Sequence, residues 1–380
     1  MPASGTKTAL VLTGGGARAA YQVGVLAAIR DLLPDKKRNP FPIICGTSAG
    51  ALNAAYLATT ADNFGDGVGL LAHLWRNFHA GDVYRADALG MGTVVASWLA
   101  AMAGGWLLHK SPRSLLDNSP LRQLVTRHID FSRIEDAIEH RHLHSISITC
   151  SGYSSGQCVS FFQGRKDLEP WERSQRFGAH VKLGVDHLLA SSAIPFIFPA
   201  VKVHREYFGD GSMRQVAPIS PAIHLGADKI LVIGAGRMST PEAFRESDGT
   251  YPSLAQIAGH ALSSIFLDSL WADIERANRI NKTLGLIPER IRQAQGMSLR
   301  PIEVLVIAPS ERLDHIAAGH AKSLPWPVRA MLGGIGAMNK NGGALTSYLL
   351  FERSYTRALI NLGRQDTLAR RDEVLAFLES

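Results

Sequence analysis

The sequence predicts an α/β fold in which a largely parallel central sheet has helices on both faces. The first 60 residues alternate strand, glycine-rich turn, helix, strand, Gly-Ser-Gly turn and helix, an order typical of parallel sheets. Apolar runs at 229–233 and 302–307 predict two further strands. With 380 residues, of which 46% are hydrophobic and 19% charged, the chain can bury a sizeable core.

The first turn lies between a predicted strand at 8–13 and a predicted helix at 17–33. It consists of Gly14, Gly15 and Gly16. Because glycine has no side chain, these backbone N–H groups can approach a small anion closely. Such N–H groups could hold the oxyanion that develops when an ester carbonyl is attacked.

The second turn has the form G-x-S-x-G, with Gly46, Ser48 and Gly50. An apolar run at 41–45 predicts a buried strand before it, and the alanine-rich run at 49–60 predicts a helix after it. This is the context of a nucleophile elbow, the sharp strand-to-helix turn that exposes a serine hydroxyl. The helix N-terminus directs its free N–H groups toward that serine.

A third motif lies near the middle of the chain. A hairpin-like apolar stretch ends in Gly209-Asp210-Gly211-Ser212, which places one carboxylate between glycines. Asp-Gly on its own is most often a turn. Because this motif follows the glycine turn and the serine turn in the chain, we interpret it as more than a turn.

Together the three motifs resemble those of the patatin-like phospholipases, a family of lipid acyl hydrolases. The motifs concerned are Gly14-Gly15-Gly16-Ala17-Arg18, Gly46-Thr47-Ser48-Ala49-Gly50 and Asp210-Gly211-Ser212. The runs at 115–121 and 190–199 are also similar to family segments, so that the resemblance covers about residues 8 to 235. Ser212 departs from the family pattern, which usually has Gly or Ala there.

The resemblance implies a patatin-like three-layer sandwich and a catalytic dyad of Ser48 and Asp210. Ser48 would attack the acyl carbonyl and Asp210 would accept its proton, while Gly14, Gly15 and Gly16 form the oxyanion hole. The supporting residues would be Arg18, Gly46, Gly50 and Gly211. Arg18 has two readings, as a support of the oxyanion loop or ligand of a phosphate head group, or as a structural Arg paired with a carboxylate.

Three alternatives remain open at this point. Gly14-x-Gly16-x-x-Ala19 also matches a dinucleotide-binding fingerprint, with Asp35 about 20 residues on, which would indicate a Rossmann-type oxidoreductase. His224 follows Asp210 in the order needed for a Ser–His–Asp triad, although a histidine in a predicted helix is more often structural. The chain could also be a lipid-binding module without catalytic turnover.

The remaining composition indicates a cytoplasmic enzyme without metal or cofactor. The three cysteines, Cys45, Cys150 and Cys158, show no metal spacing, and we expect no disulfide framework, no signal peptide and no nucleic-acid partner. The formal net charge of +7 favours peripheral contact with an anionic membrane surface. The expected partner is therefore a phospholipid or another acyl lipid.

We expect a catalytic domain at 6–236 and a mostly helical extension at 237–380 packed on it, with one added strand at 302–307. Helices are predicted at 254–284, 346–362 and 371–378. The uncharged run 88–108 has three possible interpretations: a membrane span, a membrane-touching lid or acyl-chain wall, and a buried helix pair.

Overall fold

The computed structural model describes residues 6–87, 92, 114–236, 251–297, 299–338 and 342–379. At its centre is one sheet in the order β10-β9-β1-β2-β3-β4-β6-β5, with β8 paired to β3 and β7 paired to β8. The strands are β1 (Thr8–Leu12), β2 (Ile43–Thr47), β3 (Ser145–Gly152), β4 (Cys158–Gly164), β5 (Trp171–Arg173), β6 (Arg176–His180), β7 (Val201–Val203), β8 (Glu206–Asp210), β9 (Lys229–Ile233) and β10 (Glu303–Ile307).

The strands β10, β9, β1, β2 and β3 are parallel, which confirms the predicted α/β class with a largely parallel sheet. Every residue of β1 is buried, as expected for a strand covered on both faces. Leu10 and Leu12 belong to one apolar cluster and Ala9 and Val11 to the other, so two separate cores lie on the two faces.

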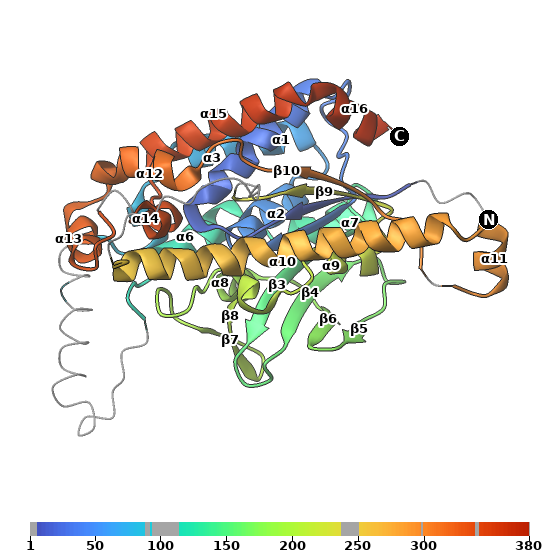
Figure 1. The fold of residues 1–380 in the computed structure, drawn as a ribbon, viewed down its shortest axis with the longest axis horizontal. Coiled ribbons are helices and arrows are strands. Elements are labelled where there is room, and N and C mark those ends of the chain that lie inside the picture. Colours follow the sequence, from blue (N-terminus) through green and yellow to red (C-terminus); the bar gives the residue numbers. More distant parts are fainter. Residues whose placement is uncertain are drawn as a thin grey trace.

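Helices cover both faces of this sheet (Figure 1). Helices α1, α2, α3 and α15 pack on one face, and α9 and α10 contribute to the core on the other. The helices are α1 (Ala20–Leu32), α2 (Ala49–Thr59), α3 (Phe64–Arg76), α4 (Ala80–Val83), α6 (Ser119–His128), α7 (Ser132–Glu139), α8 (Val185–Ser191), α9 (Ser220–His224), α10 (Leu254–Gly285), α11 (Glu289–Ala294), α12 (Leu313–His320), α13 (Trp326–Gly334), α14 (Gly343–Leu349), α15 (Arg353–Ala369) and α16 (Arg371–Glu379), with 3₁₀ turns η1 (Gly16–Ala19), η2 (Gly211–Arg214) and η3 (Ala321–Ser323).

The C-terminal residues contribute directly to the sheet and its helical layers. Strand β10 extends the parallel sheet beside β9. Helix α15 packs against α1 so closely that a Cβ on Gly24 would lie 2.1 Å from the carbonyl oxygen of Ile360, and one on Gly363 would lie 2.2 Å from that of Tyr21. The two helices can therefore pack at this distance only because glycine occupies both positions.

The single helix predicted at 346–362 is wrong, because two helices, α14 and α15, occupy this region with a break between them. At the break the hydroxyl of Tyr84 donates to the carbonyl oxygen of Leu349 at 2.9 Å. The carboxylate of Glu352 accepts from the backbone N–H of Ala80 at 3.1 Å. Tertiary hydrogen bonds thus replace the helical ones over an apolar pattern that continues through the break.

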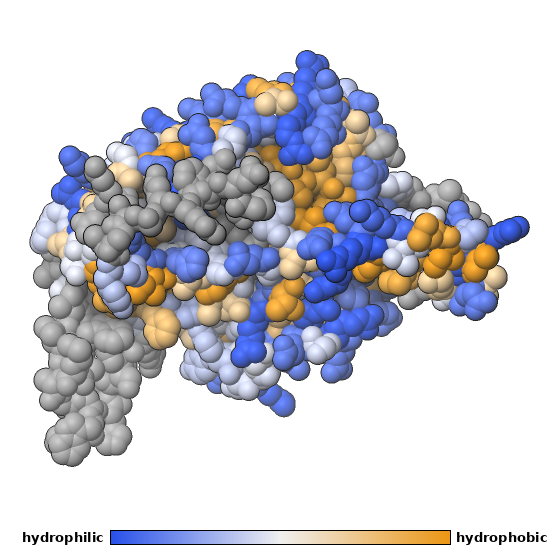
Figure 2. Space-filling model, in the orientation of Figure 1, coloured by the Kyte–Doolittle hydropathy of each residue, from blue (hydrophilic) through white to orange (hydrophobic). Residues whose placement is uncertain are grey.

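The far end of α10 and the short helix α11 project beyond the sheet (Figure 1). Figure 2 shows apolar side chains on this projection, where Leu286, Ile291 and Leu299 are exposed. With 32 residues, α10 is about 48 Å long. Its other end packs on α14, so the projection lies far from that helix.

The predicted run 88–108 lies outside the described residues, apart from Gly92, as do Trp98, Trp106 and His109. Among the described helices, none has both the length and the apolar composition that crossing a bilayer requires.

Candidate active site

Ser48 lies at the turn between β2 and α2 in a strained backbone conformation. Its φ is 56° and its ψ is −129°, values that residues other than glycine rarely adopt. The turn has no room for side chains at the flanking glycines: a Cβ on Gly46 would lie 2.6 Å from Cα of Ala51, and one on Gly50 would lie 2.3 Å from the carbonyl oxygen of Leu12. The G-x-S-x-G pattern is therefore a steric requirement of this turn.

A second serine supports the turn. The backbone N–H of Ser48 donates to Oγ of Ser191 at 2.9 Å, and that hydroxyl donates to the carbonyl oxygen of Thr149 at 2.6 Å. Ser191 is fully buried at the end of α8. Ser191 lies within the run 190–199, but nothing in the sequence indicates this role, because its partners come from two other elements.

Asp210 comes next to the serine turn through the pairing of three strands. Thr47 at the end of β2 pairs with Thr149 of β3, and the adjacent Cys150 pairs with Asp210 at the end of β8. A Cβ on Gly211 would lie 2.1 Å from the carbonyl oxygen of Thr149, so the turn after Asp210 packs directly on β3. Antiparallel pairing of β8 thus brings the carboxylate to the edge where Ser48 lies.

The carboxylate of Asp210 is 1% exposed and only partly hydrogen-bonded. Oδ1 accepts from the N–H of Ser212 at 2.9 Å, whereas Oδ2 is buried and has no hydrogen-bond partner among the described residues. Burial raises the pKa of Asp210 to about 6, while the nearby hydroxyl of Ser48 and the backbone and hydroxyl of Ser212 act in the opposite direction. Ser212, the departure from the family pattern, therefore interacts favourably with the charged form of Asp210.

The glycine loop lies between the serine turn and the C-terminal part of the chain. Among the described residues, the N–H groups of Gly14 and Gly15 donate no hydrogen bond. Gly16 has a φ of 54°, and a Cβ there would lie 2.2 Å from the carbonyl oxygen of Tyr348. Gly16 and Ser48 line the same cavity, so the loop and the hydroxyl lie side by side.

Arg18 holds the glycine loop against α14. Its Nε donates to Oγ of Ser347 at 2.8 Å, and its two terminal nitrogens donate to the hydroxyl of Tyr348 at 3.1 Å and to the carbonyl oxygen of Ala344 at 3.4 Å. The side chain is 5% exposed and forms no ion pair among the described residues. Of the two interpretations of Arg18, the pairing with a carboxylate is therefore not found among the described residues, and hydrogen bonds to hydroxyl and carbonyl groups hold the side chain.

A buried polar network lies beneath the same loop. Gln22 donates to the carbonyl oxygen of Thr13 at 2.8 Å, and Asn53 donates to Oε1 of Gln22 at 3.0 Å. The indole of Trp75 donates to Oδ1 of Asn53 at 2.8 Å. Gln22, Asn53 and Trp75 lie on three different helices, which explains why no local pattern in the sequence identified them.

The cavity beside Ser48 is apolar and small. Its volume is about 30 Å³, and its walls include Leu52, Ile194, Phe198 and Phe351. Such a volume has room for only a few water molecules. An acyl chain can enter only if the surrounding side chains move.

His224 and His187 have partners other than Asp210. His224 stacks on Trp171 with ring centroids 4.8 Å apart, and burial is the main cause that lowers its pKa to about 4. The Nδ1 atom of His187 accepts from the N–H of Gly184 at 3.1 Å. Among the described contacts, Asp210 has no histidine partner. The described contacts therefore give no support to a Ser–His–Asp triad.

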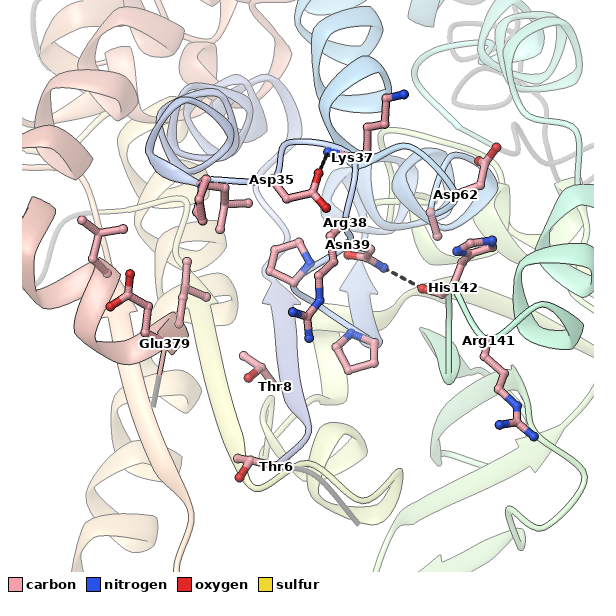
Figure 3. Close-up of a pocket in the computed structure, with 17 residues that line it drawn as sticks. Thr6, Thr8, Asp35, Lys37, Arg38, Asn39, Asp62, Arg141, His142 and Glu379 are labelled. Atoms are coloured by element: carbon pink, nitrogen blue, oxygen red, sulfur yellow. Dashed lines mark hydrogen bonds between the residues drawn. The ribbon is translucent and has the colours of Figure 1, made fainter. Parts of the chain in front are cut away.

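Another cavity lies at the opposite end of the sheet. It has a volume of about 830 Å³ and lies near the amino ends of β1 and β2, with Asp35, Arg38 and Arg141 at its edge (Figure 3). Oδ1 of Asp35 accepts from the N–H of Lys37 at 3.0 Å and so closes its own loop. Because the glycine loop follows the carboxyl end of β1, Asp35 is not placed to bind a ribose beside it.

The described residues contain no group of three or more side chains placed to bind a metal ion.

Comparison with known proteins agrees with the motifs. The model of the patatin-like phospholipases matches residues 10–223, more than half of the chain. A curated protein of Pseudomonas aeruginosa, the cGAMP-activated phospholipase, is 29% identical over 214 residues, which are 55% of this chain and 53% of that protein. The chain thus spans about half the length of this curated relative.

Two solved structures show low similarity to the whole chain. VipD from Legionella pneumophila has a TM-score of 0.35 and 14% identity, with 91% of this chain and 66% of that chain covered. The human GIVD cytosolic phospholipase A2, in complex with methyl gamma-linolenyl fluorophosphonate, has a TM-score of 0.45 and 13% identity, with 98% and 58% covered.

Proposed function

Because this chain belongs to the patatin-like phospholipase family of carboxylic ester hydrolases, we propose that it cleaves fatty-acyl esters of phospholipids through Ser48 and Asp210. The observation that carries the proposal is the proximity of a strained serine turn and a buried carboxylate with one unbonded oxygen. Both residues are nearly inaccessible to solvent, so a proton can pass between them without competition from bulk water.

In the first half of the reaction, Oγ of Ser48 forms a bond to the acyl carbon and its proton goes to Asp210. The glycine loop donates N–H groups to the resulting oxyanion, and losing one such donor typically costs about 3 kcal/mol. When the tetrahedral intermediate collapses, the bond to the glycerol oxygen breaks. The leaving alcohol takes the proton from Asp210, and Ser48 remains acylated.

In the second half, Asp210 removes a proton from a water molecule that attacks the acyl-serine. The fatty acid leaves and the proton returns to Ser48. A carboxyl group with a pKa of about 6 suits both roles, because it is mostly charged at neutral pH yet basic enough to accept a proton in the transition state.

The small cavity supports the further proposal that the site must open before it accepts an acyl chain. A lipid surface is one candidate trigger, since the formal net charge is +7 and the substrate is an acyl lipid. The name of the curated relative gives another, because that protein is described as activated by cGAMP. Peripheral binding to an anionic membrane is part of this proposal.

The deciding experiment is covalent labelling with a fluorophosphonate, followed by mass-spectrometric mapping of the modified residue. It is run alone, with detergent micelles, with anionic vesicles and with cGAMP. We expect modification at Ser48, enhanced by at least one of the added components, and its loss in Ser48→Ala and in folded Asp210→Asn.

Absence of labelling under all four conditions would contradict the proposal. Binding to vesicles without labelling would instead favour a lipid-binding module that lacks turnover. Ser192 lines the same cavity, so mapping to the individual residue is essential.

A further inference from the structure

A second cavity begins one residue from Asp210. It has a volume of about 430 Å³, and its lining includes Tyr153, Gln175, Pro195, Gly209 and Arg214, which we call the Tyr153–Arg214 groove. Gly209 directly precedes Asp210 in β8.

The groove and the Ser48 cavity are lined by consecutive residues at one point of the chain. Pro195 of the groove lining follows Ile194, which lines the Ser48 cavity. Asp210 itself directly follows Gly209 of the groove lining, and its carboxyl group lies near the hydroxyl of Ser48.

Arg214 supplies a cation to the groove. It lies at the end of η2, is exposed, and has neither an ion pair nor a side-chain hydrogen bond among the described residues. Its guanidinium carbon would lie 3.7 Å from a Cβ on Gly156, a residue with a φ of 65°. The guanidinium group thus lies alongside Gly156 and presents a planar fork of donors suited to phosphate oxygens.

Two neutral groups accompany this cation. The hydroxyl of Tyr153 would lie 2.6 Å from a Cβ on Gly209, and burial together with the charge of Asp210 raises the pKa of Tyr153. Tyr153 consequently keeps its proton and can act as a donor. The amide of Gln175 has no side-chain partner among the described hydrogen bonds and is a third donor at the groove.

The hairpin of β7 and β8, which leads to Asp210, carries charges of both signs. Lys202 and Arg205 are exposed on it. The acidic residue there, Glu206, accepts hydrogen bonds from the N–H groups of Ser154 and Ser155, at 2.7 and 2.6 Å. Glu206 lies against Gly152 of the groove lining, so the cation of the groove itself is Arg214.

We propose that the Tyr153–Arg214 groove is the head-group subsite and that Arg214 binds the phosphate diester of the phospholipid. The proposal rests on the hydrolytic function proposed above. The acyl chain enters the apolar cavity, the ester carbonyl lies at Ser48, and the phosphate extends past Asp210 to Arg214. The chemistry recognised is a phosphate diester on glycerol, and free phosphate lacks the glycerol that this path requires.

The test compares two soluble substrates, one with and one without a phosphoglycerol head group. Dihexanoylphosphatidylglycerol and dihexanoylglycerol are used as monomers, so that binding to a lipid surface does not contribute. In Arg214→Gln we expect KM for the phosphate-bearing substrate to rise about tenfold, equivalent to ~1.4 kcal/mol. We expect kcat/KM for dihexanoylglycerol to stay within twofold.

Two matched variants accompany this one. Arg214→Lys keeps the charge but loses the fork, and we expect an intermediate KM. Arg290→Gln removes an exposed arginine on the projecting α11, and we expect both substrates to be unaffected.

Equal losses on both substrates would overturn the proposal, as would an unchanged KM for the phosphate-bearing one. Fluorophosphonate labelling reports on the dyad separately and should proceed at the wild-type rate in Arg214→Gln. If the wild type neither labels nor turns over, the dyad fails, and binding of glycerophosphoglycerol to Ser48→Ala is then followed by NMR. Loss of that binding in Ser48→Ala with Arg214→Gln supports the subsite, whereas no binding, or equal competition by inorganic phosphate, overturns it.

Discussion

At the scale of single residues, the burial of Asp210 affects both the stability of the folded chain and the basicity of its carboxylate. Its carboxylate is buried, one of its oxygens has no described partner, and its pKa is raised from 3.8 to about 6. Since folding raises the pKa, the charged form is less favourable in the folded chain than in the unfolded one. The same shift makes the carboxylate a better base.

Replacing Asp210 with Asn should therefore stabilise the protein at neutral pH while abolishing turnover. The contribution of Asp210 to the stability of the wild type should fall as the pH rises from about 4 through 6, because the folded carboxyl is forced to ionise there. The rise in the pKa of Asp210 corresponds to a loss of roughly 3 kcal/mol in the free energy of unfolding at pH 7.5. Urea unfolding at pH 4 and 7.5 measures it, and we expect a gain in Asp210→Asn at the higher pH only.

The pH dependence of activity provides a second test of the raised pKa of Asp210. Because Asp210 accepts a proton only when charged, kcat/KM of the wild type should rise with pH through about 6 and then level off. A flat profile between pH 5 and 7, or equal losses of stability with pH in wild type and variant, would assign these properties to another group.

At the scale of elements, α14 fixes the glycine loop. The carbonyl oxygen of Tyr348 packs on Gly16, and Arg18 donates to Ser347, Tyr348 and Ala344 of the same helix. The loop at the start of the chain thus depends on a helix more than 300 residues later. This favours a structural role for Arg18 over contact with a phosphate.

Arg18→Gln is expected to lower the free energy of unfolding by about 2–3 kcal/mol, since hydrogen bonds to a buried charge are lost. Arg18→Lys should not restore it, because an ammonium cannot reach three partners in a plane. Exposed Arg38→Gln serves as the control. Unchanged stability with a higher KM for phospholipid would instead indicate that Arg18 binds the head group.

At the scale of the whole molecule, the C-terminal part completes the sheet and one helical layer. Strand β10 covers the edge of β9, and α15 covers α1. Lys229 at the start of β9 donates to the carbonyl oxygen of Phe377 in α16 at 3.0 Å. We propose that residues 6–236 and 237–380 fold as one cooperative unit.

A chain ending at residue 236 should consequently fail to fold, because it exposes the β9 edge and the apolar face of α1. A chain ending at residue 370 removes α16 alone and should stay soluble with reduced stability. Solubility and urea unfolding distinguish the two. A soluble, cooperatively unfolding 1–236 chain would show that the catalytic part is an independent domain.

The sequence by itself determined the α/β class, the order of the early elements and the family. It could do so because these depend on local patterns: apolar runs, helical periodicity and glycines that sharp turns require. The close contacts of Gly46, Gly50 and Gly211 give a steric reason for those motifs. These motifs could therefore be recognised in the sequence without knowledge of the fold.

Only the tertiary structure decided which groups meet. Ser191 contacts Ser48, Arg18 contacts α14, and β8 brings Asp210 to the serine turn by antiparallel pairing with β3. The break between α14 and α15 also depends on Tyr84 and Glu352, whose partners are distant in the chain. These contacts join residues tens to hundreds of positions apart, and their energy exists only when strands and helices have packed.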